Sequence, residues 1–145
     1  ARNLREMVRL QCPIVTICIG EGGSGGALGL GVGNRIYLME NAVYSVISPE
    51  SGAAIIYRDA GKAEQAAAAL RMTAPDLLEF GLIEGVIPEP GEDAHTDWDQ
   101  AALNMAVTLR QTLDELSSIS PDGLIQQRYE KFRRMGNASL TELRG

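Results

Sequence analysis

The sequence is poor in the residues that build metal sites and disulfides. Its 145 residues include only two cysteines, Cys12 and Cys18, and a single histidine, His95. The two cysteines flank one short apolar segment, too close along an extended chain to bridge easily, and with one histidine they cannot build a zinc site. We therefore expect no metal in this chain. Two free thiols fit the reducing environment of the cytoplasm.

Cationic excess and long apolar runs are also lacking. The chain has 13 Lys and Arg against 19 Asp and Glu, a formal net charge of −6. This balance leaves no excess positive charge to neutralise nucleic-acid phosphates, so we expect no nucleic-acid partner. No apolar stretch predicts a membrane span. With 45% hydrophobic and 22% charged residues, the chain can instead bury the core of one globular unit.

Glycine is the residue that the chain has in abundance. Of its 16 glycines, half lie between Gly20 and Gly33. The β-branched run at 13–19 predicts a buried strand before them, and residues 27–32 predict a closely packed helix after them. Glycines between a strand and a helix let other atoms approach the backbone and leave amide N–H groups uncovered at the positive end of the helix. Such a turn is suited to holding negative charge.

Spacing alone leaves several chemistries open for this glycine stretch. The letters GEGGSG at 20–25 match G-x-G-x-x-G, and Glu40 follows about twenty residues later, as in dinucleotide-binding domains. Residues 22–26 also match G-x-S-x-G, the nucleophile elbow of serine hydrolases, with Ser24 as nucleophile and His95 as its base. A P-loop is excluded, because no Lys-Ser or Lys-Thr follows. An oxyanion hole made of backbone amides and simple close packing of helix on strand complete the alternatives.

The rest of the chain predicts strands and helices in alternation. Apolar, β-branched runs predict strands, and capping residues, prolines and apolar stripes predict helices. We expect strands over 35–39, 43–47 and 82–87, the end of an amphipathic helix over 1–10, and helices that begin at or near residues 49, 61, 75, 97 and 121. This order gives an α/β class, and from pattern alone a doubly wound nucleotide-binding sheet ranks first. No repeat or linker divides the chain, so we expect one domain.

Two C-terminal helices are predicted over residues 97–135. The first carries apolar residues at intervals of three and four, as expected of a face that covers a core or a subunit interface. These are Trp98, Ala102, Met105, Leu109, Leu113 and Leu116. The second carries basic residues that we expect to form a solvated face. These are Arg128, Lys131, Arg133 and Arg134.

Longer stretches of the sequence resemble one family. GEGGSGGAL at 20–28, GVG at 31–33, YSVISPE at 44–50 and IPEP at 87–90, with His95 after it, are similar in identity and order to the α subunit of bacterial acetyl-CoA carboxylase carboxyltransferase. The resemblance runs from about residue 1 to about residue 136. It implies an α/β fold of the crotonase-like (ClpP/crotonase) spiral type. Residues 1–145 would then be the C-terminal portion of one carboxyltransferase domain, the second half of a subunit.

The resemblance also implies an activity and a site. Members of this family transfer the carboxyl group of carboxybiotin, held on the biotin carboxyl carrier protein, to acetyl-CoA, which gives malonyl-CoA for fatty acid biosynthesis. Carried over residue by residue, Gly25 and Gly26 would form a backbone oxyanion hole for the biotin carbonyl. Gly22, Gly23 and Ser24 would be the substrate-binding residues beside them. The reaction needs no side-chain nucleophile, so we expect Ser24 to be a small turn residue.

Partners follow from the same resemblance. A carboxyltransferase β subunit on another chain would stabilise the acetyl-CoA enolate and hold most of the CoA, in an α2β2 heterotetramer that is active only with both subunits. Biotin carboxylase, which binds ATP, would belong to the wider complex. Biotin is the one cofactor implied, and His95 is expected to be a structural or interface residue. The alternatives are a ClpP-type serine hydrolase that uses Ser24 and His95, and a dinucleotide-binding domain.

Overall fold

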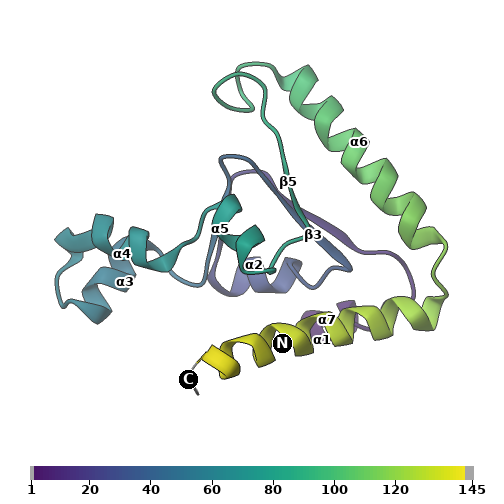
Figure 1. The fold of residues 1–145 in the computed structure, drawn as a ribbon, viewed down its shortest axis with the longest axis horizontal. Coiled ribbons are helices and arrows are strands. Elements are labelled where there is room, and N and C mark those ends of the chain that lie inside the picture. Colours follow the sequence, from purple (N-terminus) through teal and green to yellow (C-terminus); the bar gives the residue numbers. More distant parts are fainter. Residues whose placement is uncertain (1, 143–145) are drawn as a thin grey trace.

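The computed structural model describes residues 2–142, so residue 1 and residues 143–145 of the predicted domain lie outside the described part. Figure 1 shows short central strands, two long C-terminal helices beside them and a pair of helices that stands apart. The elements in chain order are α1 (Arg2–Met7), β1 (Val15–Cys18), β2 (Glu21–Gly23), α2 (Ser24–Leu30), β3 (Arg35–Met39), β4 (Val43–Ser45), α3 (Pro49–Ile56), the 3₁₀ turn η1 (Ala60–Lys62), α4 (Ala63–Leu70), α5 (Ala74–Glu79), β5 (Gly85–Ile87), α6 (Trp98–Ser117) and α7 (Pro121–Glu142).

Two small parallel sheets form the centre of the fold. In the first sheet β3 lies between β1 and β5, with Val15 opposite Arg35. In the second sheet β2 pairs with β4, and Gly22 lies opposite Tyr44. Parallel neighbours need crossover connections, and here the chain passes through β2 and α2 between β1 and β3. The glycine stretch therefore lies at the carboxyl end of β1, where the chain leaves one sheet for the other.

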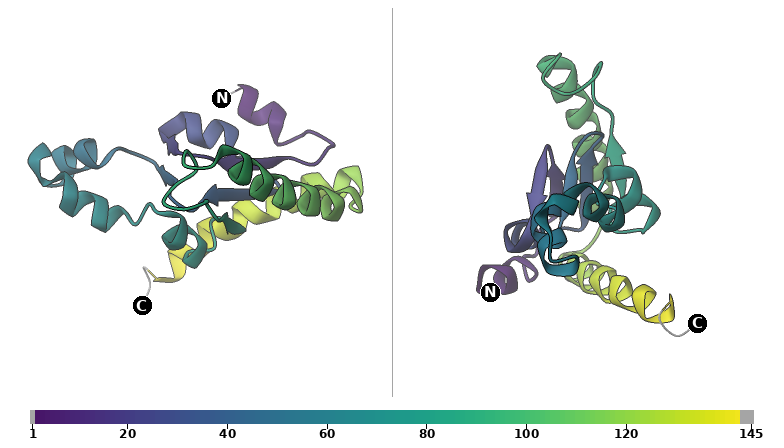
Figure 2. Two further views of the ribbon diagram at one scale, coloured as in Figure 1. Left: turned by 90° about the horizontal axis from the view of Figure 1, so that it is seen from above. Right: turned by 90° about the vertical axis from the view of Figure 1, so that its left-hand side faces the viewer.

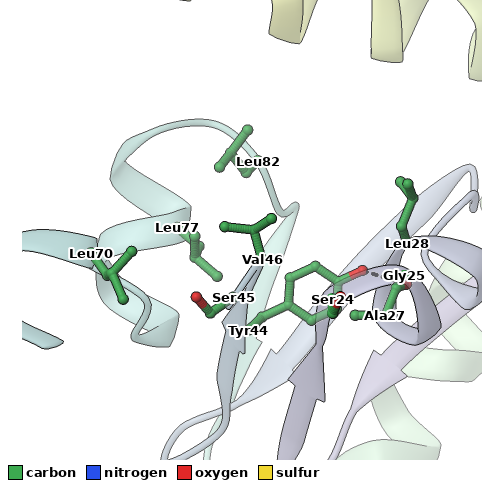
Figure 3. Close-up of a pocket in the computed structure, with 10 residues that line it drawn as sticks. All are labelled: Ser24, Gly25, Ala27, Leu28, Tyr44, Ser45, Val46, Leu70, Leu77 and Leu82. Atoms are coloured by element: carbon green, nitrogen blue, oxygen red, sulfur yellow. Dashed lines mark hydrogen bonds between the residues drawn. The ribbon is translucent and has the colours of Figure 1, made fainter. Parts of the chain in front are cut away.

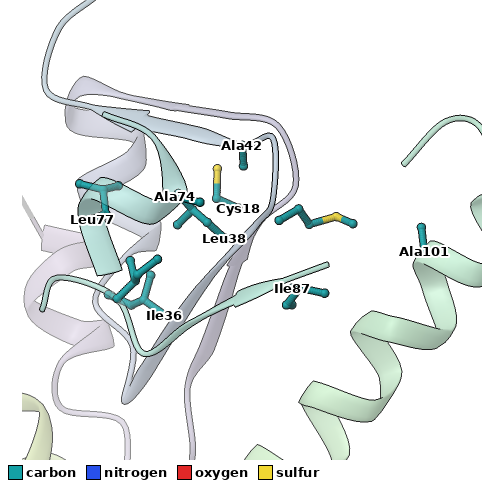
Figure 4. Packing of buried hydrophobic residues seen from close by; sticks show 10 residues of the cluster. Cys18, Ile36, Leu38, Ala42, Ala74, Leu77, Ile87 and Ala101 are labelled. Atoms are coloured by element: carbon teal, nitrogen blue, oxygen red, sulfur yellow. The ribbon is translucent and has the colours of Figure 1, made fainter. Parts of the chain in front are cut away.

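One apolar core packs around β3. Leu38 is completely buried, and Ile36, Met39 and Ile87 are exposed by 5% or less. Figure 4 shows Ile36 and Ile87 in the same cluster as Leu38, with Leu77 contributed by α5. A strand that is covered on both faces has a nearly continuous apolar sequence, which is why the run at 35–39 predicted β3 with its observed bounds.

The helices α3 and α4 form an arm that extends away from the sheets (Figures 1 and 2). The two helices pack on each other and on η1, and Ala53 and Ala66 are buried. The hydroxyl of Ser48 accepts a hydrogen bond from the N–H of Ser51 at 3.3 Å, which confirms Ser48 as the cap of α3.

The prediction of a solvated basic face on the last helix is wrong for two of its residues. Arg128 is 1% exposed and Lys131 is 6% exposed. The Nζ of Lys131 donates to Oε2 of Glu84 at 2.7 Å. Burial lowers the pKa of Lys131, and the bond to Glu84 opposes that shift. Buried charges need such partners, so these two side chains fasten α7 to the body of the fold.

The apolar stripe expected on α6 is confirmed only in part. Three of its members are exposed, namely Trp98, Ala102 and Leu113. The buried residues of the helix are Ala101, Thr112 and Leu116, so its inner face is rotated relative to the predicted stripe. A polar contact accounts for part of this rotation, because Tyr37 and Thr112 share a hydroxyl hydrogen bond of 2.9 Å. No helix in the described residues is long and apolar enough to cross a membrane.

Candidate functional site

The glycine stretch folds as a short strand followed directly by a helix. The strand is β2, and α2 begins at Ser24, three residues before the start predicted from the sequence. Ser24 has a φ of +54°, a left-handed value that turns the chain from strand to helix. Gly25 and Gly26 then form the first turn of α2, where backbone N–H groups have no partner within the helix. No side chain of the described residues caps this end.

The glycines of this stretch are of two kinds. A Cβ on Gly22 would lie 2.8 Å from Cε2 of Tyr44 and closer still to Cδ2, so glycine is needed there for the protein's own packing. A Cβ on Gly25 or Gly26 would meet no described atom within 4 Å, and neither residue has a positive φ. Packing and backbone conformation therefore do not account for this pair. Glycine there leaves space in which a ligand can approach the backbone.

Two pockets meet at the glycine turn. The first has a volume of about 440 Å³, and Figure 3 shows its lining: Ser24, Gly25, Ala27, Leu28, Tyr44, Ser45, Val46, Leu70, Leu77 and Leu82. The second has a volume of about 480 Å³ and reaches from the turn to the start of α3. Its lining includes Glu21, Gly22, Gly23, Ser24, Ser45, Ser48 and Glu50. Ser24 lies in the wall of both pockets.

The structure gathers most of the predicted site residues at these pockets. Gly22, Gly23 and Ser24 line the second pocket, and Gly25 lines the first. Gly26 follows in the same helical turn. No group of three or more His, Cys, Asp or Glu that could hold a metal ion occurs among residues 2–142.

The residues on which the serine hydrolase and dinucleotide-binding alternatives depend are not placed for those functions. His95 lines neither pocket; its side chain is 79% exposed and pairs with Asp93, so it is not placed to serve Ser24 as a base. Glu40, the acidic residue of the dinucleotide pattern, accepts a hydrogen bond from the N–H of Glu89 at 3.1 Å. The doubly wound sheet favoured by pattern alone is wrong, because the strands divide into two separate parallel sheets.

Sequence reasoning missed the roles of two residues beside the turn. Tyr44 donates a hydrogen bond from its hydroxyl to the carbonyl of Ala27 at 2.6 Å. The thiol of Cys18 is buried and donates to the carbonyl of Gly20 at 3.5 Å. Burial raises the pKa of Cys18, and the bond to Gly20 opposes that shift. Only the strand pairing of β2 with β4 brings Tyr44 to the glycines, so no local pattern could have revealed it.

The fold is that of a crotonase-like α/β protein. It superposes on a chain of a Pseudomonas malonate decarboxylase hetero-tetramer, solved in complex with coenzyme A, with a TM-score of 0.62. The match covers 90% of this chain and 51% of that chain at 18% sequence identity. At this low identity the match is informative about the fold alone. The match confirms the fold class expected from the sequence.

Sequence comparison gives the family. A family model described as acetyl co-enzyme A carboxylase carboxyltransferase-like matches residues 1–136, and the chain belongs to this family. It is 52% identical over 141 residues to the acetyl-coenzyme A carboxylase carboxyl transferase subunit alpha of Bacillus thuringiensis (strain Al Hakam). It is 50% identical to the protein of that name from Bacillus cereus (strain G9842). Each match covers 97% of this chain, which spans 44% of the length of these curated relatives.

Proposed function

We propose that this chain is part of the α subunit of an acetyl-CoA carboxylase carboxyltransferase, which transfers the carboxyl group of carboxybiotin to acetyl-CoA and so forms malonyl-CoA. Family membership over residues 1–136 supports the reaction. One structural observation supports its location: Gly25 and Gly26 begin an uncapped helix beside a pocket and have open space where a Cβ would stand.

The chain's own groups fit the oxygen of a biotin ring. When bound, carboxybiotin supplies the carboxyl group, and negative charge collects on its ring carbonyl oxygen as that group leaves. The N–H groups of Gly25 and Gly26 would donate to this oxygen, and the positive end of α2 adds to the attraction. A fixed donor of this kind contributes about 3 kcal/mol to lowering the barrier. No step calls on the hydroxyl of Ser24.

The wall of the first pocket supports the same assignment. Val46, Leu77 and Leu82 face the glycine turn across the pocket (Figure 3) and give it an apolar side suited to a bicyclic ring.

We further propose that CoA is held mainly by a carboxyltransferase β subunit on another chain, in an α2β2 heterotetramer. Among the described residues, neither pocket has Lys or Arg in its lining, which supports binding of the CoA phosphates by another chain. The biotin carboxyl carrier protein would deliver carboxybiotin to the turn, and biotin carboxylase would complete the system in the cytoplasm.

The test is Gly26→Val in the full-length α subunit reconstituted with its β subunit. We expect kcat for carboxyl transfer to fall about a hundredfold, because the side chain enters the space of the ring, while the Kd for CoA changes little. Gly29→Val is the matched control, since Gly29 also has open space at its Cβ but lies in the last turn of the same helix, away from the N–H groups of its first turn. Circular dichroism checks that both variants fold. A folded Gly26→Val enzyme with the parental kcat contradicts the proposal.

A further inference from the structure

Tyr44 contacts the glycine turn at both of its ends. The pairing of β4 with β2 places Tyr44 opposite Gly22, and the ring lies against this glycine. The hydroxyl of the same side chain donates to the carbonyl of Ala27 at 2.6 Å. Gly25 and Gly26 lie between these two contacts in the chain, and Figure 3 shows the ring of Tyr44 extending from β4 to α2.

The bond to Ala27 fixes how α2 leaves β2. The carbonyl of Ala27 follows Gly26 directly and also accepts a hydrogen bond from the N–H of Gly31 at 2.8 Å. A Cβ on Gly31 would overlap the hydroxyl of Tyr44, so glycine at this position keeps room for that hydroxyl. Burial raises the pKa of Tyr44 above its ordinary value of about 10, which keeps the hydroxyl protonated at neutral pH.

We propose that Tyr44 is a positioning residue for carboxyl transfer, which acts through Ala27 to hold the N–H groups of Gly25 and Gly26 in one direction. The inference rests on the proposed function, in which these two groups bind the oxygen that becomes negative. Fixed donors are effective because they need no reorganisation during the reaction, and small errors in their placement reduce the rate. In this role Tyr44 needs no contact with the substrate.

Tyr44→Phe in the full-length enzyme with its β subunit tests the inference. The change removes the bond to Ala27 and leaves the ring against Gly22. We expect kcat to fall about three- to tenfold with the KM for acetyl-CoA unchanged, as for the loss of one hydrogen bond that matters only in the transition state. Tyr37→Phe is the matched control, since this half-buried tyrosine bonds to Thr112 and lines neither pocket. That variant should lose stability and keep its kcat.

Measuring Tyr44→Phe in the Gly26→Val variant as well distinguishes this inference from the proposed function. In Gly26→Val enzyme, Tyr44→Phe should cause little further loss, because both changes act on the same donors. An unchanged kcat in folded Tyr44→Phe enzyme, or an equal fold-loss in the Gly26→Val background, overturns the positioning role alone. An unchanged kcat in Gly26→Val enzyme overturns the proposed function. If Tyr44→Phe does not fold, Gly31→Ala decides, since its methyl group would meet the hydroxyl of Tyr44 and, at 2.9 Å, the carbonyl oxygen of Ala27, and so should disturb this bond and lower kcat. An unchanged kcat in folded Gly31→Ala enzyme overturns the positioning role.

Discussion

The guanidinium of Arg128 donates a hydrogen bond to Oδ1 of Asn34 at 2.6 Å, across 94 positions of the chain. Asn34 is completely buried, and its amide uses both ends: Oδ1 also accepts from the N–H of Ile14 at 3.1 Å, and Nδ2 donates to the carbonyl of Leu124 at 3.0 Å. These bonds join α7 to the starts of β1 and β3.

Arg128→Met is expected to destabilise the protein. Arg128 donates to the carbonyls of Val8, Leu10 and Cys12 as well as to Asn34, and methionine leaves these acceptors without their donor. We expect a loss of about 3 kcal/mol in the free energy of unfolding, measured by urea denaturation. Arg134→Met, on the exposed side of the same helix, should stay within about 0.5 kcal/mol of the parent. Equal losses in the two variants would show that the network does not stabilise the fold.

Gly22→Ala should lower the melting temperature because its methyl group would overlap the ring of Tyr44. Overpacking of this kind costs about 1–3 kcal/mol. Gly23→Ala, one residue on, is the control, since its Cβ would meet no described atom within 4 Å. Thermal unfolding followed by circular dichroism measures both variants, and matching melting temperatures would refute the packing role of Gly22.

Ser24→Ala should keep most of the carboxyl-transfer activity. The proposed chemistry uses backbone amides, and alanine keeps a Cβ at the residue whose φ is +54°. Steady-state kinetics of the reconstituted enzyme provides the measurement. A loss approaching the roughly 10⁶-fold that follows removal of a triad serine would instead support the hydrolase alternative.

Cys18 should make the protein less stable at alkaline pH. Burial raises the pKa of its thiol in the folded state, whereas in the unfolded state it titrates near its ordinary value of about 8.5. The stabilising contribution is complete below about pH 8.5 and is lost as the pH rises toward the folded-state pKa, because only the unfolded state releases the proton there.

Cys18→Ala provides the comparison for this pH dependence. Its free energy of unfolding, measured with urea between pH 7 and pH 10, should fall less steeply than that of the parent. Cys12→Ala is the matched control, because it removes the exposed thiol instead of the buried one. Parallel curves for Cys18→Ala and the parent would count against the burial of this thiol.

Local sequence predicted those parts of the fold that depend on neighbouring residues. The apolar run of β3, the Ser48-Pro49 start of α3 and the position of the glycine turn were all visible in short stretches. The burial of Arg128 and Lys131 could not be predicted from short stretches, because their partners Asn34 and Glu84 lie far away in the chain. A cluster of basic residues on a helix predicts a solvated face unless those distant partners are known.

Some features of the candidate site could likewise be predicted from the sequence, and others could not. Composition located the glycine stretch, and the family resemblance alone singled out Gly25 and Gly26, which remain a prediction that the proposed kinetics must test. The contact between Gly22 and Tyr44 depends on the register of β2 with β4, and a glycine-rich strand such as β2 has no apolar alternation from which that register could be predicted. The buried face of α6 likewise includes Thr112, whose hydroxyl bonds to Tyr37, a tertiary contact that the apolar stripe does not reveal.

Because Arg128 is the donor that satisfies the carbonyls of Val8, Leu10 and Cys12, early segments of the chain depend on a helix that the ribosome makes more than a hundred residues later. Until α7 emerges, Nδ2 of Asn34 lacks its acceptors on that helix and these carbonyls lack the donor groups of Arg128, so water must take their place. This part of the core can therefore form only after α7, the last helix described here, has been synthesised. Nascent chains halted before residue 121 should be recognised by chaperones or degraded.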